Sequence, residues 1–79
     1  MSPTVFRVGQ YRFYFFSREE DRAHVHVKSP HGEAKFWLEP IISLAAYSGL
    51  SKKQLTDIQK IVESRRDEIA KAWDEHFEA

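Results

Sequence analysis

Two histidines separated by a single residue mark the part of this chain that is best equipped for chemistry. His24 and His26 alternate with apolar residues, and a second alternating run follows a turn that contains Pro30 and Gly32. Residues two apart on a β-strand share a face, so the two runs predict a hairpin with one apolar and one polar face. The polar face would carry His24, His26, Lys28, Glu33, Lys35, Trp37 and Glu39.

Cleavage of a phosphodiester is one reaction that such a face could support. One group must take a proton from the attacking hydroxyl, another must protonate the leaving oxygen, and a cation must stabilise the charge that develops. Imidazole titrates near neutral pH, and the predicted hairpin register sets His26 opposite Lys35 and His24 opposite Trp37. His24, His26 and Lys35 are therefore the candidate catalytic residues of a ribonuclease-like activity.

Metal binding and a plain surface role are the alternatives for the same histidines. Imidazoles at positions i and i+2 can share a metal ion if His31, Glu33 or Glu39 supplies a third ligand. An ammonium group opposite His26 would repel a dication, and the chain contains no cysteine. We therefore predict no required metal and no cofactor.

A first hairpin is expected to extend the polar face. Residues 4–8 and 11–16 are rich in β-branched and aromatic types, and Gly9-Gln10 between them suits a type II′ turn. This pairing sets Val8 opposite Tyr11 and Phe6 opposite Phe13. Aromatic side chains can stack on the bases of single-stranded RNA. The candidate binding residues are Arg7, Arg12, Tyr14, Trp37 and Glu39.

The C-terminal third predicts a long helix over about 52–77. Ser51 and Gln54 have the spacing of a capping box. The apolar stripe behind it consists of Leu55, Ile58, Val62, Ile69, Trp73 and Phe77. Residues 41–48 fit neither a helical nor a strand period cleanly, and of a short helix closed by Gly49 and an irregular extension of the sheet we favour the helix.

These elements predict a single α+β domain over residues 1–79. A sheet of about four antiparallel strands in meander order would span about 4–39, with the long helix packed on its apolar face. The opposite face would stay uncovered, and an uncovered face with an exposed tryptophan usually binds something. Because so short a chain buries only a small core, a protein partner or a second copy as a homodimer is an expected supplement.

Composition narrows the class of protein. The formal net charge is zero, so attraction to nucleic acid or to a membrane must come from a local patch. The absence of cysteine is compatible with a reducing compartment, and no apolar run approaches the length of a membrane helix. We therefore expect a cytoplasmic protein that does not bind a membrane.

Several separate motifs in the same order resemble a small bacterial family. They are Pro-Thr-Val near the N-terminus, Tyr-Arg-Phe-Tyr-Phe-Phe-Ser, His-Val-His-Val, Gly-Glu-Ala-Lys-Phe-Trp-Leu, Gly-Leu-Ser and a final Trp-Asp-Glu-His-Phe. Together they resemble the domain of unknown function 4160 family over almost the whole chain. The family usually has prolines before the histidine pair, where this chain has Arg22 and Ala23.

The resemblance implies a toxin–antitoxin pair. Proteins of this family look like toxin components encoded beside a small antitoxin-like protein, of the domain of unknown function 2442 type, and the resemblance implies no known reaction. Our first hypothesis is a toxin-like protein that a small partner neutralises and whose histidine face acts on RNA. The alternative is a non-catalytic interaction module, or an antitoxin-side subunit, that uses the open face only to bind its partner.

Overall fold

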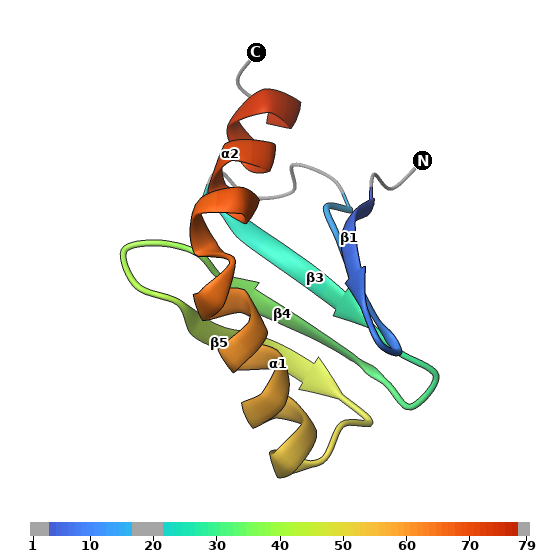
Figure 1. Ribbon diagram of the computed structural model, residues 1–79. Helices are drawn as coiled ribbons and strands as arrows, with labels where there is room; N and C mark the ends of the chain where they lie inside the picture. The colour runs from blue at the N-terminus through green and yellow to red at the C-terminus, as the bar shows by residue number, and fades with distance from the viewer. Residues whose placement is uncertain (1–3, 17–21, 78–79) are drawn as a thin grey trace.

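A five-stranded antiparallel sheet with two helices on one side makes up the protein (Figure 1). The computed structural model describes residues 4–16 and 22–77. The elements are β1 (Thr4–Val8), β2 (Tyr11–Tyr14), β3 (His24–Lys28), β4 (Glu33–Trp37), β5 (Ser43–Ser48), α1 (Lys52–Ser64) and α2 (Arg66–Phe77). Because the strands follow one another in the order β1-β2-β3-β4-β5, the sheet is a meander. The predicted α+β class is confirmed.

The two predicted hairpins form in the predicted registers. Phe6 lies opposite Phe13 and Val8 opposite Tyr11 in the first hairpin. In the second, strands β3 and β4 pair His26 with Lys35 and His24 with Trp37. Among the described residues, Gly9 has a φ of 58° and no non-glycine residue has a positive φ. A positive φ at the first turn position alone matches the expected type II′ turn.

The short helix expected over residues 41–48 is wrong, because β5 occupies this segment as a fifth strand. The register of β4 and β5 shifts between Lys35, which pairs with Ala46, and Phe36, which pairs with Leu44. Ala45 is therefore an extra residue, which moves side chains out of strict alternation. This irregularity explains why the apolar residues of the segment match neither a helical nor a strand period.

The single long helix is also corrected, since α1 and α2 meet at Arg65. The predicted capping box is present at the start of α1, with Ser51 and Gln54 each bonded to the other's backbone. At Arg65 the backbone leaves helical geometry, with φ −115° and ψ 24°. Ser64 Oγ donates to the Ile61 carbonyl at 2.9 Å, a local bond that competes with the helical ladder. The apolar stripe nevertheless continues across the break.

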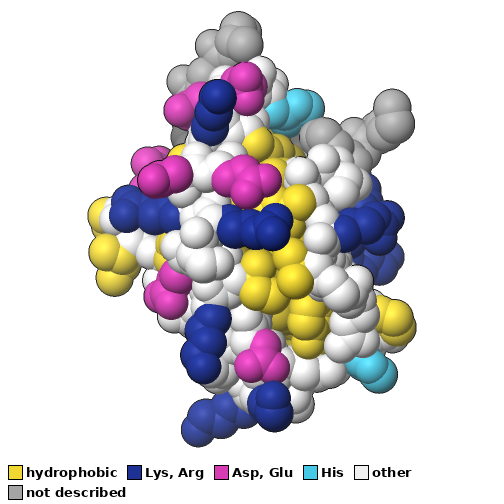
Figure 2. Space-filling view, viewed as in Figure 1, with side chains coloured by type: hydrophobic (Ala, Val, Ile, Leu, Met, Phe, Trp, Pro, Cys, Tyr) yellow, Lys and Arg dark blue, Asp and Glu magenta, His cyan; other side chains and the backbone are white. Residues whose placement is uncertain are grey.

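The core lies between the helices and one face of the sheet. The largest fully buried side chains are Phe13, Phe15, Phe36, Ile58, Ile69, His24, Val25, Val27 and Val62. The helices do not cover all of that face, because a strip of hydrophobic surface remains between them and β1 (Figure 2). The Arg65 guanidinium lies 4.4 Å from the centre of the Phe6 ring. Arg65 thus covers apolar surface at the rim of the sheet with its side chain.

Two glycines hold the β3–β4 turn against the end of β5. A Cβ on Gly32 would collide with the Ser48 carbonyl oxygen, and one on Gly49 would collide with the His31 carbonyl oxygen. Gly49 also has a φ of 77°, a conformation that side chains disfavour. The close approach fixes the end of β5 beside Glu33, at one end of the uncovered side of the sheet. No helix in the described part of the chain is long and apolar enough to cross a membrane.

Candidate functional site

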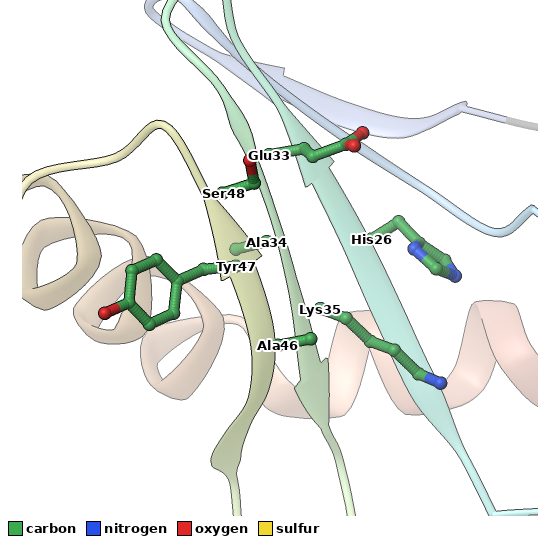
Figure 3. Close-up of a pocket in the computed structure, with 7 residues that line it drawn as sticks. All are labelled: His26, Glu33, Ala34, Lys35, Ala46, Tyr47 and Ser48. Atoms are coloured by element: carbon green, nitrogen blue, oxygen red, sulfur yellow. The ribbon is translucent and has the colours of Figure 1, made fainter.

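The side of the sheet away from the helices, here called the open face, presents the charged side chains of four strands. His26 on β3 and Lys35 on β4 are half-buried neighbours that project from the sheet on the same side (Figure 3). They border an open depression lined by His26, Glu33, Ala34, Lys35, Ala46, Tyr47 and Ser48. The depression therefore joins the predicted hairpin to β5, the strand that stands in place of the expected short helix.

The expected exposure of His24 on an uncovered face is wrong, because its side chain does not reach solvent. Its side chain is 1% exposed and its ring centre lies 5.1 Å from that of Trp73 on α2. Nδ1 lies 2.8 Å from the Arg22 carbonyl oxygen; this oxygen can only accept, so Nδ1 donates the proton. Helix α2 runs past the start of β3 (Figure 1), and its Trp73 packs against the His24 ring. Of the two histidines, only His26 is partly accessible.

Two cations contact the Trp37 ring. The Arg22 guanidinium is 4.3 Å and the Lys35 ammonium 4.7 Å from the ring centre. Such contacts hold a flexible cation in one place through the negative ring face. Glu39, which stays a predicted binding residue, also secures this arrangement, because its main-chain carbonyl oxygen accepts from Arg22 Nε at 2.8 Å.

Tyr14 forms a second contact between an aromatic ring and a cation, here Arg12. The Arg12 guanidinium is 4.6 Å from the Tyr14 ring centre, and Arg12 Nε donates to Thr4 Oγ1 at 2.7 Å. The His26 ring stacks on Tyr14 with 5.5 Å between centres and 25° between planes. Burial raises the pKa of the Tyr14 phenol, the Glu33 carboxylate raises it further, and Arg12 acts in the opposite direction. Tyr14 therefore remains a neutral hydroxyl at physiological pH.

The raised pKa of Tyr14 predicts that the folded state loses stability at alkaline pH. The phenol holds its proton more tightly in the folded than in the unfolded chain, where the reference pKa is 10.0. Its stabilisation is therefore complete below pH 10.0 and lost as the pH rises through the folded-state value. In a titration that follows phenolate absorbance, the wild type should show a late increase in absorbance at the highest pH. The Tyr14→Phe variant should lack this late increase. An unchanged titration in this variant would contradict the assigned environment.

The open face is more basic than the whole chain. Its cations are Arg7, Arg12, Arg22, Lys28 and Lys35, and its carboxylates are Glu33 and Glu39, which is five against two among the described residues. Arg7 and Arg12 lie opposite each other, as do Arg12 and Lys28. Within residues 4–16 and 22–77, no three His, Asp or Glu side chains gather as a metal site would require.

Arg22 and two residues of β5 also belong to this face, beyond the predicted residues. Arg22 extends the alternation of His24 and His26 by two residues, and that spacing is the sequence signal for its place on this face. Ala46 and Ser48 lie on β5, whose register shift hides the strand pattern in the sequence. The contact between His24 and Trp73 joins distant parts of the chain and has no local pattern in the sequence.

Comparison with known proteins gives a family and no functional precedent. No curated protein matches the chain, and no solved structure matches it. One family model, described as a domain of unknown function (DUF4160), matches residues 10–74, which include every strand from β2 to β5, α1 and most of α2. The chain therefore belongs to the DUF4160 family.

Proposed function

We propose that this chain is the toxin-like component of a two-protein pair and that it acts by binding RNA along the open face. The observation that carries this proposal is the set of cations held over aromatic rings in a chain of zero net charge. Cations fixed beforehand lose little side-chain entropy when they meet phosphates. The pairing with a small protein partner rests on the resemblance of the sequence motifs.

Binding is favoured over cleavage as the action of this face. Two-histidine acid–base catalysis needs both imidazoles to reach the substrate, and His24 is buried with its Nδ1–H held by a backbone carbonyl. His26 and Lys35 remain as neighbours on the face, where the Lys35 ammonium can contact a phosphate beside the half-buried imidazole. We therefore expect RNA that meets this protein to be bound and left intact.

The salt dependence of RNA binding tests the proposal. Arg22→Gln with Lys35→Gln removes two charges from the open face, and the affinity for a labelled single-stranded RNA, measured by fluorescence anisotropy, should fall about tenfold. The slope of log affinity against log salt should fall by about 1.4, since each phosphate contact contributes roughly 0.7 for a single strand. Gel analysis of the same samples reports whether the RNA stays intact.

A matched pair on the other side of the molecule controls for net charge. Lys52 and Lys60 are exposed on α1, and changing both to Gln removes the same charge away from the open face. This control should bind like the wild type. Equal losses in the two double variants would show non-specific attraction and overturn the proposed site, and absence of RNA binding by the wild type would overturn the proposed target.

A further inference from the structure

Strand β5 forms one edge of the sheet and carries neither a charged residue nor a proline that would hinder pairing with another chain. Natural edge strands avoid pairing with other chains by carrying charges or proline or by being short. β5 has six residues and is the longest strand, and residues 40–51 include no charged side chain in a chain that is 30% charged. Leu44 and Tyr47 on this strand are 37% and 58% exposed. The opposite edge, β1, carries Arg7.

We infer that β5 pairs with β5 of a second copy of this chain, antiparallel and about a two-fold axis between Ala45 and Ala46. This axis sets Leu44 of one copy opposite Tyr47 of the other. Both residues pair within the chain with positions on the helix side, Phe36 and Ala34 respectively. Large apolar side chains therefore meet each other on the same side of the joined sheet, as cross-strand pairing requires.

The side chains of β5 that lie on the open face also match across the two-fold axis. Ser43 of one copy would lie opposite Ser48 of the other, and these residues pair within the chain with Trp37 and Glu33 on the open side. The bulge at Ala45 makes both matches consistent, because it puts Leu44 and Tyr47 on one side despite their odd spacing. Small polar residues thus meet small polar residues.

Charge favours a second copy over an unrelated partner. Two identical strands normally bring like charges together, but β5 brings none, and a charged partner strand would find no opposite charge to recognise. A two-fold contact of a strand with itself also closes after two copies, whereas a heterologous contact can continue into a filament. We therefore expect a dimer and no larger assembly.

The dimer would complete the depression beside His26. Ala46 and Ser48 line this depression at the free edge of the sheet, so Ser43 of the second copy would become part of its rim. Each copy would then contribute its His26 and Lys35 to one continuous open face. The dimer does not depend on the proposed RNA function, and its test uses no RNA.

Sedimentation equilibrium of the full chain tests the contact. A single pair of six-residue strands buries less than the roughly 800 Å² per partner of a standard stable interface. We therefore expect the wild-type mass to rise from monomer to dimer with concentration. Ala46→Lys places a cation near the axis and should shift the midpoint at least tenfold to higher concentration. Ala70→Lys, the same change at an exposed alanine on α2, should leave the midpoint unchanged.

A charge exchange makes the test specific for the register. Leu44→Lys with Tyr47→Lys, and separately Leu44→Glu with Tyr47→Glu, should each give a monomer with a wild-type circular dichroism spectrum. Mixing the two should restore a dimer, because lysine then lies opposite glutamate at both ends. A wild type that stays monomeric at millimolar concentration, a dimer unaffected by Ala46→Lys, or a mixture that stays monomeric would overturn the inference. If the charge variants lose their fold, the Ala46→Lys and Ala70→Lys comparison decides alone.

Discussion

Trp73→Ala should remove most of the stability of this domain. Trp73 is 4% exposed and contacts Phe15, His24 and Phe77, with ring centres 5.5, 5.1 and 4.2 Å away. Truncation of a buried tryptophan costs about 3–5 kcal/mol, and a chain of this length has about 4–12 kcal/mol in total. Denaturant unfolding followed by circular dichroism should show a lower midpoint or no folded baseline.

Truncation of an exposed aromatic residue is the control for Trp73→Ala, because it removes a large ring without removing core packing. Phe16 is 58% exposed, and Phe16→Ala should cost less than about 1 kcal/mol. If Trp73→Ala unfolded at the same denaturant concentration as Phe16→Ala, the packing of α2 on the sheet would be wrong. The Trp73 variant should also disturb the open face, because the same indole covers His24.

The hairpins could be predicted because their determinants are local. Alternation and Gly9 at its turn are enough to set Phe6 against Phe13, and the same reasoning sets His26 against Lys35. The α1 capping box is local in the same sense, since Ser51 and Gln54 are three residues apart. Interactions between near neighbours in the sequence leave a pattern that can be recognised without a structure.

The fifth strand and the helix break depend on less regular features. The extra residue Ala45 disturbs the alternation of β5, so that the strand pattern is lost in its middle. The break at Arg65 falls inside an apolar stripe whose period continues on both sides, from Val62 to Ile69. In each case one backbone irregularity decides which secondary structure forms, although the spacing of the apolar residues is also compatible with a different one.

The burial of His24 could not be predicted for a different reason. Strand alternation correctly gives its side as that of Trp37, but exposure depends on what covers that side. The end of α2 extends past the sheet, and Trp73 closes over the imidazole from a distant part of the chain. Alternation therefore assigns a side chain to a face, and only the packing of the whole chain decides whether solvent reaches it.

This difference between the two histidines gives the sharpest test in cells. With the partner protein absent, we expect wild-type expression to inhibit growth and His26→Gln to abolish that inhibition while the fold stays intact. Glutamine keeps hydrogen bonding and approximate volume but cannot become a cation. Lys35→Gln should act in the same direction. Growth curves, the amount of protein and RNA integrity are the measurements.

His24→Gln should act through stability instead. Its ring is packed against Trp73 and its Nδ1–H is bonded to the Arg22 carbonyl, so the substitution should cost about 1–3 kcal/mol. Purified His24→Gln should unfold earlier than His26→Gln, whose side chain is only half-buried. A harmless wild type would refute the toxin proposal. A toxic His26→Gln, Lys35→Gln double variant would show that the open face is not the effector surface, and the interaction module would then be the better account.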